Sequence, residues 1–285
     1  MSSKVYILLP VHNRRAITEK IVDCLVAQSY SNFHLILIDD GSTDGTSEMV
    51  KAKIGDLTIL RGKGDWWWAG SLQQGIDWLK RNEVKDHDVV VFMNDDVVFD
   101  SDFLQVAVGL LNERGGMLLP QVHNQKTGKI EETGVYADLK KRSFVTAVTP
   151  EQINCLPTRG LFMRMSTLRR VGGFYPRLLP HYLSDYAYTI RANRLGLMLS
   201  TSPKLLIHFD GEASGFQNYD GLTVLEFVKR IFSIKSRFNP IYWTTFIILT
   251  SPILLAPWRI LRVWLSTAKM ILKRVVFGGS IKAHE

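Results

Sequence analysis

The chain has 285 residues, of which 46% are hydrophobic and 22% are charged, and its formal net charge is +8. This composition excludes a disordered chain, and the length is sufficient for one large domain with its own core. Residues 1–225 contain 25 basic and 25 acidic side chains, whereas residues 226–285 contain ten basic and two acidic ones. The main domain is therefore neutral, which excludes a basic nucleic-acid-binding body and predicts no nucleic-acid partner.

Apolar runs alternate with stretches of helical spacing over the first hundred residues. The predicted strands are residues 5–9, 33–38, 57–60 and 89–93, and the predicted helices are residues 16–28, 48–53 and 71–81. This alternation predicts an α/β fold, a doubly wound and mostly parallel sheet with helices on both faces. Ligands of such sheets bind beyond the carboxyl ends of the strands.

Polar clusters follow three of these strands. They are Asn13, Asp39-Asp40 and Asn94-Asp95-Asp96. Two adjacent carboxylates at the end of a buried strand are costly unless a cation neutralises them, and hard divalent cations prefer oxygen ligands and phosphates. Asp95 and Asp96 therefore indicate a metal-diphosphate site. The alternative for both acidic pairs is ordinary turn chemistry, in which aspartates end strands whatever the function.

The second part of the main domain has weaker patterns. Residues 117–150 contain glycine-rich breaks that indicate hairpins or loops without a clear strand order. Helical patterns return at 166–171 and 184–195, on either side of the turn Gly172-Gly173-Phe174. Two cysteines in separate apolar contexts predict neither a disulfide framework nor a metal cluster, and they favour a reducing compartment.

Several short motifs follow one another in a fixed order between residues 5 and 214. They are Leu9-Pro10-Val11-His12-Asn13, the run from Ile38 to Thr46, Asn94-Asp95-Asp96 in the Asp-x-Asp position, Arg159-Gly160 with Gly172-Gly173-Phe174, and Ser184-Asp185 with Arg191. This set resembles glycosyltransferase family 2, whose members have the A-type nucleotide-sugar transferase fold. The resemblance implies a catalytic domain at 1–225, with a nucleotide-binding half at about 1–115 and an acceptor half at about 116–225.

The resemblance also implies roles on the donor side. Pro10, His12, Asn13 and Asp40 would line a uracil or thymine pocket, where a carboxylate can accept the ring N–H of the base. Asp95 would face the ribose.

The same resemblance implies a metal position. Asp96 would ligate Mg²⁺ or Mn²⁺ at the diphosphate, and His208 matches a position that contacts the metal or the diphosphate. Asn94 departs from the acidic pattern and removes one charge, although it still offers a neutral oxygen. The alternative for His208 is a structural histidine near a strand end.

Asp185 occupies the position of the catalytic base in the family. An inverting transferase needs one carboxylate that removes the proton of the acceptor hydroxyl as its oxygen attacks the anomeric carbon. The preceding residue is Ser184, where relatives have an acid. The alternative is an N-terminal helix acid that interacts with the helix dipole. Arg159, Gly160 and Arg191 are expected in the acceptor half.

Three consecutive tryptophans, Trp66-Trp67-Trp68, lie in a glycine-rich loop. They cannot all face one side of a helix, so either one meets a ligand, a membrane or a partner, or two lie in the core and one is partly exposed. The resemblance places Trp68 and Gly70 near the donor nucleotide. Similar loops in rhamnosyltransferase-like transferases of bacterial surface polysaccharides favour a dTDP- or UDP-linked donor.

The last 60 residues form a basic and apolar tail. Residues 241–258 carry no charge and reach the minimum length of a spanning helix, but Pro252 and Pro257 argue against a straight span. Beyond Trp258, apolar and basic residues alternate as in a helix that lies on an anionic membrane. We therefore expect residues 241–285 to bind a membrane surface. The alternative is a helix packed on the enzyme or on a second subunit, which would give a homo-oligomer.

Two functional hypotheses follow. The first is an inverting, metal-assisted glycosyltransferase that adds a hexosyl or deoxyhexosyl unit to a lipid-linked or nascent surface glycan at the cytoplasmic face of the plasma membrane. The second is a non-catalytic nucleotide-sugar-binding or scaffold subunit, which Asn94, Ser184 and Ala187 favour because they depart from the acidic pattern.

Overall fold

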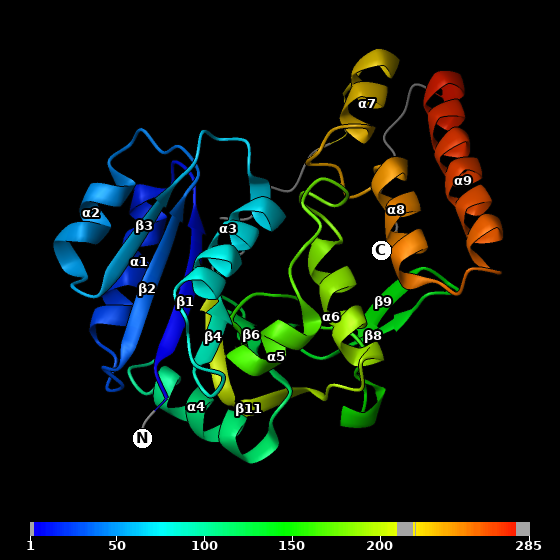
Figure 1. Ribbon diagram of the computed structural model, residues 1–285. Coiled ribbons are helices and arrows are strands. Elements are labelled where there is room, and N and C mark those ends of the chain that lie inside the picture. The colour runs from blue at the N-terminus through cyan, green and yellow to red at the C-terminus, as the bar shows by residue number, and fades with distance from the viewer. Residues whose placement is uncertain (1–2, 210–218, 220, 278–285) are drawn as a thin grey trace.

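The computed structural model describes residues 3–209, 219 and 221–277. Its main sheet has nine strands in the order β3-β2-β1-β4-β10-β6-β11-β5, with β7 paired to β6, and a separate hairpin joins β8 to β9 (Figure 1). The strands are β1 Val5–Val11, β2 Phe33–Asp39, β3 Leu57–Arg61, β4 Val89–Phe92, β5 Val97–Val98, β6 Met117–Asn124, β7 Ile130–Glu132, β8 Val135–Asp138, β9 Ser143–Thr146, β10 Leu161–Arg164 and β11 Leu199–Phe209. The helices are α1 Arg15–Val26, α2 Thr46–Lys53, α3 Trp67–Arg81, α4 Phe103–Arg114, α5 Met165–Val171, α6 Ser184–Arg194, α7 Val224–Ile231, α8 Pro240–Thr250 and α9 Ala256–Phe277.

The first four strands form the parallel sheet that the apolar runs predict. β1 pairs with β2 in register from Val5 opposite Phe33 to Val11 opposite Asp39, and its other edge pairs with β4. The carboxyl ends of β1, β2 and β4 therefore meet at one edge of the sheet. The three polar clusters that follow these strands are brought to that edge.

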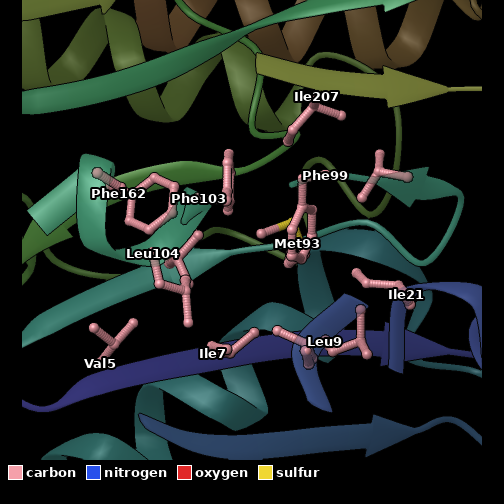
Figure 2. Close-up of a cluster of buried hydrophobic side chains, with 14 of the residues drawn as sticks. Val5, Ile7, Leu9, Ile21, Met93, Phe99, Phe103, Leu104, Phe162 and Ile207 are labelled. Carbon is pink, nitrogen blue, oxygen red and sulfur yellow. The ribbon is translucent and has the colours of Figure 1, made fainter. Parts of the chain in front are cut away.

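Alternate side chains of these buried strands enter two cores, one on each face of the sheet. Ile7 and Leu9 of β1 pack with α1 and α4 on one face, as Figure 2 shows, and Leu8 packs with α3 on the other. This two-sided burial is the reason why the strands read as continuous apolar runs rather than as alternating ones.

The second half of the sheet is mixed rather than parallel. β10 runs antiparallel to both of its neighbours, β4 and β6, and β5 and β7 are antiparallel additions at β11 and β6. Since β10 is antiparallel to both, β6 runs in the same direction as β4, and β11 continues that direction parallel to β6. The structure thus has the predicted α/β class, but the irregular region between residues 117 and 164 supplies short strands whose direction the sequence patterns did not predict.

The predicted tail forms α7, α8 and α9, which gather at one side of the molecule beyond α6 and the β8–β9 hairpin (Figure 1). The uncharged stretch 241–258 is divided between α8 and the start of α9, and Pro252 lies in the break between them. Aromatic rings of Phe144 and Trp243 join the hairpin to α8. Within the described ranges, no helix combines the length and the apolar character that crossing a membrane requires.

Candidate functional site

The two aspartates at the end of β2 hold loops in place. Asp39 Oδ1 accepts from the backbone N–H of Ser42 at 2.7 Å, and its second oxygen accepts from the hydroxyl of Ser47. Asp40 accepts from the backbone N–H groups of Gly64 at 2.8 Å and Trp66 at 2.9 Å. Its carboxylate therefore fixes the loop that leads into α3, a role that the Asp-Gly-Ser pattern did not reveal.

His12 and Asn13 tie the first motif to the second. His12 Nδ1 lies 2.6 Å from the carbonyl oxygen of Asp40, and Asn13 Oδ1 accepts from the backbone N–H of Thr43 at 2.8 Å. Asn13 adopts a φ of 49°, a left-handed conformation that asparagine tolerates better than most residues. Pro10 pairs with Ile38 inside the sheet, directly beneath this junction.

The loop of residues 64–68 packs against the carboxylate of Asp40, and we call this loop, together with Gly70, the tryptophan wall. Trp66 and Trp68 pack on the core cluster beneath α3, and Trp68 Nε1 donates to Thr158 Oγ1 at 3.2 Å. Trp67 has a φ of 56° and lies 6.0 Å from the ring of His181, measured between centroids. Trp66 and Trp68 thus lie against the core rather than inside it, and all three tryptophans are half-buried. α3 starts at Trp67, four residues before the predicted helix.

Gly70 and His181 lie next to the tryptophans of this wall. A Cβ atom on Gly70 would lie 3.3 Å from Trp66 Cβ and 3.7 Å from Pro176 Cβ, so the glycine allows α3 to pack against the loop before α6. Burial, with a smaller effect of Lys235, lowers the pKa of His181 to about 4. The imidazole is therefore neutral at physiological pH.

Two arginines neutralise the acidic pair at the end of β4. Arg14 Nη1 lies 2.9 Å from Asp95 Oδ1, and its Nη2 lies 3.8 Å from Asp96 Oδ2. Arg159 Nη1 lies 2.7 Å from Asp96 Oδ1. Burial raises the pKa of Asp95 to about 6, against the lowering effect of Arg14, and the charge of Asp96 adds to the rise.

Residues beside this pair suit a hard divalent cation. Asn94 Oδ1 is buried and has no hydrogen-bond partner among the described residues, and it belongs to the residue two positions before Asp96. A cavity of about 210 Å³ is lined by Asp96, Val98 and His208, among others. No group of three His, Cys, Asp or Glu side chains in the described ranges forms a metal cluster. Mg²⁺ typically needs only one or two carboxylates because substrate phosphates and waters complete its shell, so the residues present fit such an ion.

Asp185 lies in the first turn of α6, two residues after Leu183, which precedes the helix and has a φ of 68°. Its Oδ1 accepts from the backbone N–H of Tyr186 at 2.8 Å. Burial is the main reason why the pKa of Asp185 rises to about 6, and the negative charge of Glu132 adds to it. The carboxylate is thus ionised at neutral pH but far more basic than an exposed aspartate.

Glu132 and Arg159 connect the two sides of the site. Arg159 Nε lies 3.2 Å from Glu132 Oε1, while its Nη1 contacts Asp96. The guanidinium therefore stands between the acidic pair at β4 and the glutamate whose charge reaches Asp185. Neither Glu132 nor Arg14 is among the predicted site residues. Arg14 directly follows the first motif, so the sequence could have indicated it as a site residue. Glu132 lies in the irregular region, where no sequence pattern indicates it.

The other residues expected in the acceptor half support turns. Gly160 has a φ of 78°, and a Cβ atom there would lie 2.6 Å from Ile207 Cδ1. Arg191 donates to the carbonyl oxygen of Gly173, and its guanidinium lies 4.7 Å from the ring centroid of Tyr175. His208 pairs with Val98 across β11 and β5, which brings it to the cavity beside Asp96.

Comparisons with known proteins give consistent matches. The family model described as Glycosyl transferase family 2 matches residues 6–171. An uncharacterized glycosyltransferase of Rickettsia felis is 25% identical over 160 residues, which cover 54% of this chain. The match spans only 24% of that relative's length.

Solved structures share the fold at low sequence identity. TarS 1–349 of S. aureus in complex with UDP-GlcNAc has a TM-score of 0.63 and 15% identity, with 98% of this chain and 93% of that chain covered. The mannosyltransferase PcManGT of Pyrobaculum calidifontis, in complex with GDP-Man and Mn²⁺, has a TM-score of 0.56 and 20% identity, covering 99% and 77% of the two chains. These likenesses show an A-type glycosyltransferase fold.

Proposed function

We propose that this chain, which belongs to glycosyl transferase family 2 because the family model matches residues 6–171, moves a sugar from a nucleotide-diphosphate donor to an acceptor hydroxyl with inversion. One observation carries the proposal: Arg159 joins Asp96, at the expected diphosphate position, to Glu132, whose charge acts on Asp185. This connection supports a single site in which the donor and the acceptor would meet.

The donor would bind at the edge where β1, β2 and β4 end. Pro10, His12 and Asn13 would surround the base, with Asp40, Trp68 and Gly70 in the wall above it. Asp95 would face the ribose, and solved relatives named as complexes with UDP-GlcNAc and GDP-Man support such a donor. A dTDP- or UDP-linked sugar such as rhamnose is our preferred donor.

A divalent cation held by Asp96, with Asn94 and His208 beside it, would neutralise charge on the leaving diphosphate. The relative named as a complex with GDP-Man and Mn²⁺ supports Mg²⁺ or Mn²⁺ in this role. Asn94 Oδ1, which is buried without a hydrogen-bond partner in the described part of the chain, is the feature that favours a bound cation.

Asp185 would act as the general base. The acceptor oxygen bonds to the anomeric carbon from the face opposite the diphosphate, as the bond between that carbon and the diphosphate oxygen breaks with its electron pair. The hydroxyl proton passes to Asp185. A carboxylate with a pKa of about 6 suits this step because it is ionised at pH 7 and still basic enough to hold the proton.

We further propose that the acceptor is lipid-linked and that α9 contacts an anionic membrane at the cytoplasmic face. Four apolar side chains at helical spacing point outward from α9: Trp258 is 62% exposed, Leu261 48%, Leu265 58% and Leu272 62%. Leu254, in the break before α9, is 89% exposed. The four exposed side chains on α9, which we call the α9 stripe, are typical of a surface that lies in a membrane interface.

The charges of α9 favour a membrane over a second copy of the chain. Arg262, Lys269 and Lys273 are exposed, and the helix contains no acidic residue. Two copies paired along this face would bring like charges together, whereas anionic lipid headgroups would neutralise them. Arg259 and Arg274 point inward instead, where they donate to Ser251 Oγ and to the carbonyl oxygen of Leu222.

Purified protein with UDP- or dTDP-sugars and Mn²⁺ tests the catalytic proposal. We expect release of nucleoside diphosphate, and Asp185→Asn should lower turnover by at least about 100-fold while nucleotide binding persists. Asp138→Asn, which alters the aspartate at the end of β8, is the matched control and should act as wild type. Turnover by Asp185→Asn close to that of wild type would exclude the base role. A wild type that binds nucleotide without any turnover would favour the non-catalytic subunit.

A further inference from the structure

Arg159 holds two carboxylates at once. Its Nη1 lies 2.7 Å from Asp96 Oδ1, its Nε lies 3.2 Å from Glu132 Oε1, and its guanidinium carbon lies 4.7 Å from the ring centroid of Phe209. The side chain is 13% exposed, and that of Asp96 is 6% exposed. The pair is therefore largely desolvated, where charge-assisted hydrogen bonds are strong.

This pairing conflicts with metal binding. A divalent cation at Asp96 would compete with Arg159 for the same carboxylate, and it would repel the guanidinium at a few ångströms. Arg159 would then need another anion. The diphosphate of a bound donor is the anion that arrives at Asp96 together with the cation, and its oxygens match the fork of a guanidinium.

We propose that Arg159 is a switch residue: it pairs with Asp96 in the free protein and transfers to a diphosphate oxygen of the donor when the cation takes Asp96, with Glu132 anchoring it in both positions. The proposal rests on the proposed function, because it takes Asp96 as the diphosphate and metal position. It differs from the acceptor role expected for Arg159 from sequence. The bond from Nε to Glu132 leaves the donors of the two Nη groups free to exchange partners.

The switch has a thermodynamic consequence. In the free protein, Arg159 acts as an internal competitor that weakens cation binding. Once a diphosphate is present, the same residue strengthens its binding. The cation and the diphosphate should therefore bind with positive coupling, and this coupling is the same whichever of them binds first.

Arg159→Gln distinguishes the switch from a merely structural role, because the two roles predict opposite changes in the Mn²⁺ affinity of the free protein. Removal of an internal competitor should tighten Mn²⁺ binding to the free protein by at least about threefold, while UDP and inorganic pyrophosphate should bind at least about tenfold more weakly in the presence of Mn²⁺. Arg159→Lys keeps the charge, so it should not tighten Mn²⁺ binding. Arg169→Gln makes the same charge change at a surface pair with Asp86 and should change neither affinity.

The experiment measures free Mn²⁺ by electron paramagnetic resonance and UDP or pyrophosphate binding by calorimetry, after circular dichroism has shown that each variant is folded. Weaker Mn²⁺ binding by Arg159→Gln than by wild type would overturn the switch and leave the proposed function intact, as would equal tightening in Arg159→Lys. If Arg159→Gln does not fold, Mn²⁺ binding to wild type that UDP fails to strengthen overturns the switch. A wild type that transfers sugar but binds no Mn²⁺, even with UDP, would overturn both the switch and the metal part of the proposed function.

Discussion

Asp185 combines two properties that oppose each other. The carboxylate lies partly buried in the first turn of α6, where burial and the charge of Glu132 disfavour its ionised form. The same surroundings make it a stronger base. Whatever its role, an aspartate in such surroundings should therefore lower the stability of the folded protein whenever it is ionised.

The pH dependence of stability tests this cost. The pKa of Asp185 is about 6 in the folded protein and 3.8 as an ordinary aspartate, so its contribution to stability is complete below pH 4 and is lost as the pH rises through 6. Asp185→Asn should remove that loss. We expect the variant to have a free energy of unfolding about 1–3 kcal/mol above that of wild type at pH 8, and equal to it below pH 4, in urea titrations.

Asp138→Asn provides a control of opposite sign. Asp138 accepts from the backbone N–H groups of Lys140 and Lys141, and these bonds hold the pKa of its carboxyl below the usual value. Its ionised form therefore stabilises the fold above the usual carboxyl pKa, so this variant should be less stable than wild type at pH 8. If Asp185→Asn were less stable than wild type at pH 8, the ionised carboxylate of Asp185 would not have the stability cost assigned to it.

At the scale of elements, the junction between β2, β3 and α3 is built around Asp40. Its oxygens bind the backbone of Gly64 and Trp66, and this fixes where α3 starts. Gly62 leaves room for the carboxylate, because a Cβ atom there would lie 2.4 Å from Asp40 Oδ1 and 2.8 Å from Trp66 Cε3. The tryptophan wall of the proposed donor site thus depends on the absence of a side chain at Gly62.

Gly62→Ala should disturb this wall. The added methyl group has to displace the Asp40 carboxylate or the Trp66 ring, so we expect a loss of about 1–3 kcal/mol in the free energy of unfolding and at least tenfold weaker UDP binding. Gly55→Ala is the matched control, because no heavy atom of the residues that the structure describes lies within 4 Å of its Cβ position. Calorimetric titration measures the UDP affinity of both variants. An unchanged UDP affinity in Gly62→Ala would show that the tryptophan wall does not contribute to nucleotide binding.

The elements that sequence reasoning predicted are those whose pattern is decided locally. β1, β2, β3 and β4 were predicted within two residues at each end, because burial on both faces leaves uninterrupted apolar runs. The start of α3 was missed because Asp40, distant in sequence, determines it. β7 and β10 were missed because three or four residues carry too little periodicity.

The candidate site divides in the same way. The motif residues come to one edge because parallel strands end together, which sequence can predict. Glu132 reaches the site only through the pairing of β7 with β6, where a register shift lies between Val122 and His123. No local pattern marks such a residue, so tertiary structure was needed to find it.

At the scale of the whole molecule, the net charge of +8 belongs to the part of the chain that packs beyond α6. α8 and α9 pack on each other and leave the α9 stripe outward. The stripe and the exposed basic residues occupy one helix that carries none of the proposed catalytic groups. The proposed membrane contact and the proposed chemistry should therefore be separable by mutation.

Leu265→Ser tests this separation. Leu265 is 58% exposed, and loss of its side chain from a membrane interface should lower partitioning to vesicles containing anionic lipid by about fivefold. Val26→Ser changes a side chain with nearly the same exposure, 57%, at the end of α1 and should leave partitioning unchanged. Cosedimentation with vesicles measures both. Equal behaviour of the two variants would argue against the α9 stripe as the contact surface.

The position of α6 adds a geometric consequence. Asp185 lies at its first turn, and Arg194 at its last turn donates to the carbonyl oxygen of Thr250 at the end of α8. The nine helical steps from Asp185 to Arg194 set these two points about 14 Å apart along the helix axis. If α8 and α9 rest on a bilayer, α6 holds Asp185, the proposed base, at a fixed height above the lipid headgroups. Acceptors would then be selected by how far their reactive hydroxyl stands from the membrane, as well as by the shape of the sugar that bears it.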